Sequence, residues 1–165
     1  KWTFKYFRNA PLRPDTIMVD DGKCFILDSK YYSYSSKEKE EDTENGEETS
    51  GSIPGSDSIQ KQITYAEFID CGINNNPNKK RFDKFRFDAE SIYNVFILPA
   101  TNTDSNFDYL GYATSEWKDN TKNYHFIHAI TLDTQFLMTN GNKNSDVFKK
   151  ELKDFILRTC KRPEN

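Results

Sequence analysis

The sequence predicts an all-β domain, an eight-stranded antiparallel up-and-down barrel with one α-helix packed outside it near the C-terminus. Aromatic and polar residues alternate along several segments, which is typical of half-buried strands. These segments follow one another through polar turns without helical crossovers, and a single amphipathic segment closes the chain. We treat residues 1–165 as one domain, because a chain of this length supports a single core.

Composition narrows the class of protein. The formal net charge is −3, with both signs mixed along the chain, which does not indicate a nucleic-acid footprint. The 13 Phe and 9 Tyr favour strands. No run approaches the ~20 apolar residues of a membrane span, so we expect a soluble chain. It begins at Lys1 rather than Met, and we expect a processed chain that has lost any signal peptide.

Eight segments carry the strand patterns. In the first, Trp2, Phe4 and Tyr6 share one face of an extended chain. A polar loop over 9–21 follows it, and the segment 92–100 is apolar on both faces, so something must cover its outer side. The predicted strands are 1–11, 23–34, 59–71, 80–88, 92–100, 107–117, 124–132 and 135–140.

The helix is predicted over 145–158. Ser145 suits an N-cap, and Asp146 lies where the helix dipole favours an anion. One apolar stripe faces a row of charged residues. The stripe consists of Val147, Phe148, Leu152, Phe155 and Ile156.

An acidic insertion interrupts the strands at about 36–57. It is rich in Glu, Ser, Gly and Thr and has almost no apolar residues, so it cannot bury enough surface to offset its ordering entropy. We expect it to be disordered. In the up-and-down order it joins the second and third strands and hangs from the closed end of the barrel. Together with the Asn/Lys bias of the chain, such an insertion is typical of apicomplexan proteins.

Three stretches resemble the lipocalin family. Trp2 followed by aromatics at period two resembles the opening motif, whose tryptophan plugs the closed end of the cup. Residues 135–142 running into 147–156 resemble the third motif and its helix, although Asn140 or Asn142 stands where the family usually has Arg. Residues 114–117 resemble the second motif loosely. Among members, the chain is most similar to the apolipoprotein-D and bacterial lipocalin group, or to a malaria-parasite lipocalin.

The resemblance also implies a disulfide among the three cysteines. Cys160 follows the helix, and in the apolipoprotein-D pattern its partner would be Cys24. Other lipocalins use a position that corresponds to Cys71, so this alternative stays open. A disulfide implies an oxidising location, and we expect a secreted protein or an extracytoplasmic or vacuolar one.

The predicted function is to bind and transport, or sequester, a small hydrophobic ligand such as a fatty acid, sterol, retinoid or tetrapyrrole. The interior of such a barrel either is filled by side chains or holds one small ligand. Two alternatives stay open: a protein-interaction module with a filled barrel, and a lipid-modifying enzyme of the same fold. The predicted ligand-binding residues are Phe4, Tyr6, Phe25, Leu27, Tyr31, Tyr65, Phe85, Phe87, Tyr109, Phe126, His128 and Met138.

Other chemistry finds little support. His125 and His128 are three apart on a predicted strand and point to opposite faces, so we expect no metal site and no cofactor. Common catalytic motifs are missing, so we expect no enzyme. A basic cluster, interpreted as a solvated face, and the net acidity lead us to expect no nucleic-acid partner. Peripheral membrane contact and homo-oligomers stay open. The basic cluster comprises Lys79, Lys80, Arg81, Lys84 and Arg86.

Overall fold

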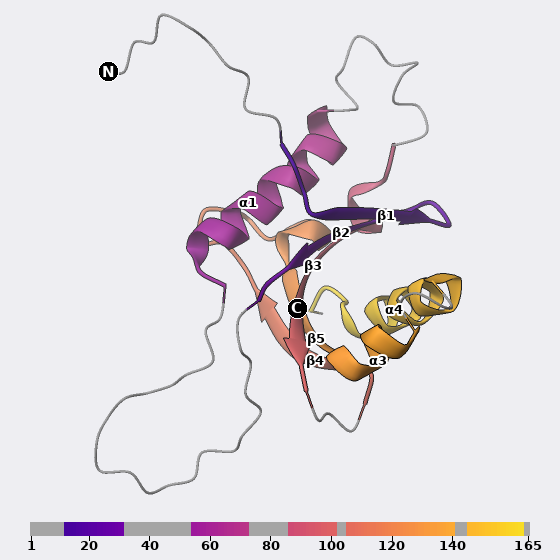
Figure 1. Cartoon of the computed structure of the whole chain (residues 1–165). Coiled ribbons are helices and arrows are strands. Elements are labelled where there is room, and N and C mark those ends of the chain that lie inside the picture. The colour runs from indigo at the N-terminus through magenta and orange to yellow at the C-terminus, as the bar shows by residue number, and fades with distance from the viewer. Residues whose placement is uncertain (1–11, 32–53, 73–85, 102–104, 141–144, 164–165) are drawn as a thin grey trace, which may run out of the picture.

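The computed structural model describes residues 12–31, 54–72, 86–101, 105–140 and 145–163, and these form one open five-stranded sheet with helices on both faces (Figure 1). The strands are β1 (Thr16–Asp20), β2 (Lys23–Ser29), β3 (Ile92–Ala100), β4 (Phe107–Ala113) and β5 (Ile127–Asp133). The helices are α1 (Ser56–Glu67), α3 (Thr134–Asn140) and α4 (Ser145–Thr159). Short helical turns are η1 (Phe68–Gly72), η3 (Ala89–Ser91) and η4 (Asn123–His125).

The sheet is mixed, with the order β1-β2-β3-β5-β4. β2, β3 and β5 run parallel, while β1 and β4 pair antiparallel with β2 and β5 at the two edges. The predicted eight-stranded antiparallel barrel is therefore wrong. Parallel neighbours need a crossover connection, and α1 lies on the chain between β2 and β3. Strands covered on both faces read as continuous apolar runs, which explains why 92–100 is apolar on both sides.

A tight hairpin joins β1 to β2. Asp21 and Gly22 form its two-residue loop with φ of 48° and 69°, and Asp20 pairs with Lys23. Two consecutive positive φ values characterise the type I′ turn, whose twist matches that of the flanking strands. The predicted polar loop over 9–21 is therefore wrong from Thr16 onward.

Two predicted strands are helices. The segment 59–71 forms α1 and η1, and its buried residues Gln62, Ile63 and Ala66 have helical rather than alternating spacing. The segment 135–140 belongs to α3, where the backbone N–H of Phe136 donates to Asp133 Oδ1 at 2.6 Å. This contact caps the first turn of the helix.

Other predicted elements are found. The strand at 92–100 is β3, and the C-terminal helix is α4, one residue longer than predicted. The strands at 23–34, 107–117 and 124–132 correspond in part to β2, β4 and β5. The strand at 1–11, most of 80–88 and most of the acidic insertion lie outside the described residues. The last residues of that insertion, Ser56 and Asp57, begin α1.

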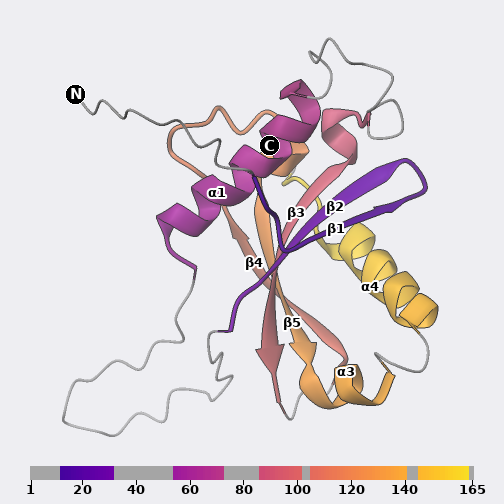
Figure 2. The same ribbon diagram turned by 45° about the horizontal axis from the view of Figure 1, so that its top comes forward.

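α1 and α4 lie on opposite faces of the sheet (Figure 2), and each face carries its own core. Cys24 and Ile26 of β2 face α1, while Phe25 and Leu27 face α4. Leu152 and Ile156 of α4 are buried against that second face. Among the described residues, no helix has both the length and the apolar character needed to cross a bilayer.

Candidate active site

Asp15 lies just before β1, and Asp28 lies near the end of β2, at the same end of the hairpin. Asp28 has the same orientation along β2 as Ile26, so it lies on the α1 side of the sheet, and it is only 3% exposed. β1 pairs with β2 from Thr16 opposite Leu27. Continuing that register by one residue brings Asp15 opposite Asp28. Asp15 Oδ2 also accepts a hydrogen bond from the backbone N–H of Ser29 at 3.2 Å.

Lys30 completes this cluster. Its backbone N–H donates to the carbonyl of Ile97 at 2.9 Å, which continues the pairing with β3 beyond the end of β2. Its ammonium group forms an ion pair with Asp28 and lies 5.3 Å from the centre of the Phe96 ring. The ring and the carboxylate together hold the ammonium group on the α1 side.

Helix α1 is hydrogen-bonded to β2 and to the segment that leads into β1. Gln62 Nε2 donates to the carbonyl of Ile26 at 2.9 Å, two residues before Asp28. One turn later, the Tyr65 hydroxyl donates to the carbonyl of Arg13 at 2.9 Å, two residues before Asp15. These two bonds fix the position of α1 relative to the ends of the hairpin that carry Asp15 and Asp28.

This arrangement suits a cation. Like charges facing each other across two strands repel, and a buried carboxylate is costly unless a cation accompanies it. In open α/β sheets, ligands bind outside the carboxyl ends of the parallel strands, which is where Asp28 lies. Mg²⁺ prefers oxygen ligands and is commonly held by one or two carboxylates together with waters and substrate phosphates. Within the described ranges there is no group of three or more His, Cys, Asp or Glu that could hold a metal by itself.

The comparisons with known proteins decide the family. The family model described as LlaJI restriction endonuclease matches residues 1–148, and this span includes the whole acidic cluster. The chain belongs to the LlaJI restriction endonuclease family. No curated protein and no solved structure matches it.

Membership of the LlaJI family overturns the lipocalin interpretation and what followed from it. A family of restriction endonucleases consists of enzymes that act on DNA. The predictions of a lipocalin, of ligand transport, of no enzymatic activity and of no nucleic-acid partner are therefore wrong. The resemblance misled because period-two aromatics and a C-terminal amphipathic helix also occur in mixed α/β sheets.

Those predicted ligand-binding residues that the structure describes do not converge on one cavity. Phe25 and Leu27 pack against α4, whereas Tyr65 and Phe87 lie on the opposite face. Tyr31 is 90% exposed just after Lys30. Phe126 is buried and Tyr109 and Met138 are exposed. Phe4, Tyr6 and Phe85, together with the predicted plug Trp2, lie outside the described residues.

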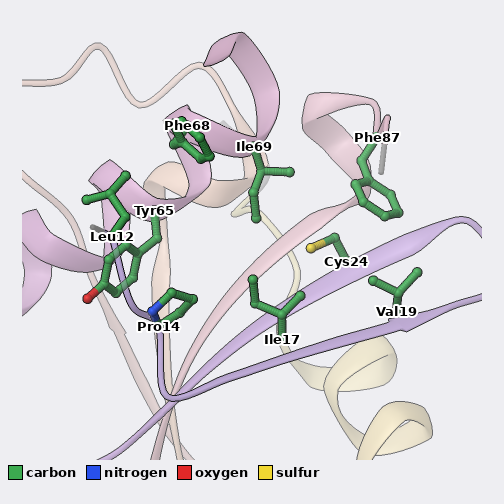
Figure 3. Close-up of a pocket in the computed structure, with 9 residues that line it drawn as sticks. All are labelled: Leu12, Pro14, Ile17, Val19, Cys24, Tyr65, Phe68, Ile69 and Phe87. Carbon is green, nitrogen blue, oxygen red and sulfur yellow. The ribbon is translucent and has the colours of Figure 1, made fainter. Parts of the chain in front are cut away.

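Tyr65 and Phe87 line an apolar groove of about 420 Å³ on the α1 side of the hairpin (Figure 3). Ile17 and Val19 of β1 form its floor together with Cys24, and residues of α1 and η1 form one of its walls. Pro14 lines it next to the site residue Asp15. The remaining lining residues are Leu12, Phe68 and Ile69.

The cysteines and histidines are also placed differently from the prediction. All three cysteines are free, and Cys24 and Cys160 lie in the cores of opposite faces, so the expected disulfide is not formed. Burial raises the pKa of Cys24 to about 12 and that of Cys160 to about 11, so both thiols stay protonated at neutral pH. His125 lies in η4, and His128 Nδ1 is 3.0 Å from the Tyr109 hydroxyl. The expected oxidising location stays a prediction.

Sequence reasoning missed Asp15, Asp28 and Lys30, although the sequence held signals for them. Asp28 directly follows the apolar run of β2, and a charged residue in a buried strand is costly unless it is paired or binds a ligand. The Asp21-Gly22 pair between two apolar runs is a strong hairpin signal, and it would have brought Asp15 opposite Asp28. The basic cluster around Lys80 had been interpreted as a solvated face, and apart from Arg86 it lies outside the described residues.

Proposed function

We propose that this protein hydrolyses DNA phosphodiester bonds with the help of a divalent cation, and that Asp15, Asp28 and Lys30 form its catalytic centre. The observation that carries the proposal is the ion pair of the buried Asp28 with Lys30, next to the hydrogen bond that joins Asp15 to the backbone of Ser29. Membership of a restriction endonuclease family supplies the substrate class.

The donor set fits a hard cation such as Mg²⁺. Asp15 and Asp28 would hold it through carboxylate oxygens, and its remaining positions would be left for water and phosphate oxygens. When bound, such an ion neutralises phosphate charge and lowers the pKa of a bound water, so that hydroxide is available at neutral pH. The carboxylates would thus position the attacking water relative to the phosphate.

Lys30 has a complementary role. Its ammonium group lies beside Asp28, so it can donate to a non-bridging oxygen of the phosphate that enters the site. Negative charge on the phosphate oxygens is stabilised in the transition state by cationic groups held in fixed positions, and the Phe96 ring and the β3 backbone hold Lys30.

The test is cleavage of long, unmethylated duplex DNA of mixed sequence with Mg²⁺. We expect Asp28→Asn, Asp15→Asn and Lys30→Met each to lower the rate by roughly a hundredfold or more, as for other groups that stabilise transition-state charge. EDTA should abolish cleavage. Circular dichroism checks that each variant is folded.

The matched control is Asp20→Asn. Asp20 lies in the same hairpin but pairs with Lys153 of α4, on the other side of the sheet. This variant should cleave at nearly the wild-type rate. Wild-type cleavage that persists in folded Asp28→Asn and Asp15→Asn would contradict the proposed centre.

A further inference from the structure

β1 is an edge strand with an apolar outer side. Among the described residues it pairs only with β2. Ile17 and Val19 are 45% and 44% exposed on the α1 side, where they form the floor of the apolar groove (Figure 3). Natural proteins protect a free edge with charges, prolines or bulges, because such an edge can pair with another strand. From Thr16 to Val19, β1 has none of these.

The hairpin determines which backbone groups of β1 point away from β2. Because its loop has two residues, Asp20 and Lys23 form the hydrogen-bonded pair that closes it. Hydrogen-bonded and non-hydrogen-bonded pairs alternate along an antiparallel ladder. The N–H and C=O groups of Ile17 and Val19 therefore point to the open edge. A strand added beside β1 would bond to it through these two residues.

We propose that β1 pairs antiparallel with β1 of a second copy of this chain, in a two-fold symmetric dimer centred on Met18. In this register Ile17 of each copy pairs with Val19 of the other, so the outward-pointing N–H and C=O groups meet. Apolar side chains come together on the groove side. Thr16 faces Asp20, so no like charges face each other within the paired strands. A register centred on Ile17 or on Val19 would overlap fewer residues of β1.

The position of the proposed catalytic centre favours a second copy as the partner. The two-fold axis of such a pair is perpendicular to the sheet, so the α1 sides of both copies lie on one surface. Asp28 and Lys30 are on that side, and Asp15 directly precedes β1. The two Asp15 residues would lie about 20 Å apart, at about 3.4 Å per residue of strand.

This arrangement matches the symmetry of duplex DNA, and this part of the inference rests on the proposed function. The two strands of a duplex are antiparallel and related by two-fold axes, which protein dimers mirror. One centre hydrolyses one strand at a time. A dimer with both centres on one surface therefore cuts both strands of a duplex in a single encounter, whereas a monomer nicks one strand.

The first measurement is the mass of the full chain in solution, by size-exclusion chromatography with light scattering, with and without duplex DNA in Ca²⁺. We expect a protein mass of twice 19.3 kDa. Val19→Lys places a charge on the edge, and Val19→Pro removes an outward N–H that the pairing with β2 does not use. Both variants should shift the protein to the monomer mass.

The control is Val147→Lys, which charges another exposed apolar residue, on α4, and should leave the dimer intact. Circular dichroism checks that each variant is folded. A wild-type monomer both with and without duplex would overturn the dimer. Dimers of unchanged stability in folded Val19→Lys and Val19→Pro would overturn the role of β1.

The second measurement follows cleavage of a supercoiled plasmid with Mg²⁺. The wild type should produce linear DNA from the earliest times, because both strands are cut in one encounter. Val19→Lys should accumulate nicked circles before linear DNA forms. If the dimeric wild type accumulates nicked circles to the same extent as this variant, the pairing of β1 does not serve cleavage of both strands.

The two proposals fail in different ways. If the wild type is a dimer that Val19→Lys dissociates, but it cleaves no DNA, the proposed function is wrong and the pairing of β1 stands. If the wild type cleaves DNA and is a monomer with and without duplex, the proposed function stands and this inference is wrong.

Discussion

Asp28 shows how one buried charge is accommodated. Its side chain is only 3% exposed, and a buried charge is costly unless it is paired. Lys30 provides the opposite charge in an ion pair, and the neighbouring Asp15 accepts a hydrogen bond from the backbone N–H of Ser29. A group that needs this many compensating contacts is more costly than an apolar residue, which points to a role in binding or chemistry rather than in packing.

His128 provides a prediction about pH at the scale of a single residue. It is 1% exposed, and burial lowers its pKa to about 4, below the ordinary value of 6.5. The unfolded chain therefore binds more protons between these values, so stability is fully present above pH 6.5 and is lost as the pH falls toward 4. We expect His128 to contribute up to about 3 kcal/mol to that loss.

The measurement is urea unfolding at several pH values between 7 and 4. His128→Gln should be less stable than wild type at pH 7 but should lose less stability on acidification. His125→Gln is the comparison, because burial also lowers the pKa of His125 while Asp119 opposes the shift. An identical pH slope in wild type and His128→Gln would refute the prediction.

At the scale of elements, the sequence patterns that predict strands and helices differ in strength from one segment to the next. The short apolar run of 92–100 favours a buried strand, and the amphipathic stripe of 145–158 is long enough to specify a helix. In 59–71, Ile59 and Ile63 share one face whether the spacing is read as strand or as helix. The buried Gln62 and Ala66, which fit only the helical spacing, resolve that ambiguity.

The hairpin turn gives a prediction at this scale. Gly22 has φ of 69°, a left-handed conformation that costs L-residues roughly 1 kcal/mol. Gly22→Ala should lower the free energy of unfolding by about that amount, measured by urea unfolding. Gly22→Asn should retain more stability, because Asn tolerates this conformation. Equal stability of the Ala variant and wild type would show that the turn is not formed as described.

At the scale of the whole molecule, the open sheet needs cover on both faces. α1 covers one face and α4 covers the other, so the interior strands are buried from both sides (Figures 1 and 2). A closed barrel would instead have had one inner core and one outer helix. The acidic site lies at the edge of the α1 layer, where a strand end, a hairpin and a helix meet.

The α4 layer can be tested by truncating its side chains. Leu152 is buried against the sheet, whereas Val147, which the sequence placed on the same stripe, is 53% exposed. Leu152→Ala should cost about 2–5 kcal/mol of unfolding free energy. Val147→Ala should cost less than about 0.5 kcal/mol. Similar costs for both in chemical unfolding would contradict the position of α4.

The sequence by itself determined the features that depend on neighbouring residues, which are the strand β3 and the helix α4. Only the tertiary structure decided that β2, β3 and β5 run parallel, because both parallel and antiparallel sheets can contain the same apolar run. It also decided which residues meet. Asp15 and Asp28 are 13 residues apart along the chain, and the pairing of β1 with β2 brings them to the same end of the hairpin.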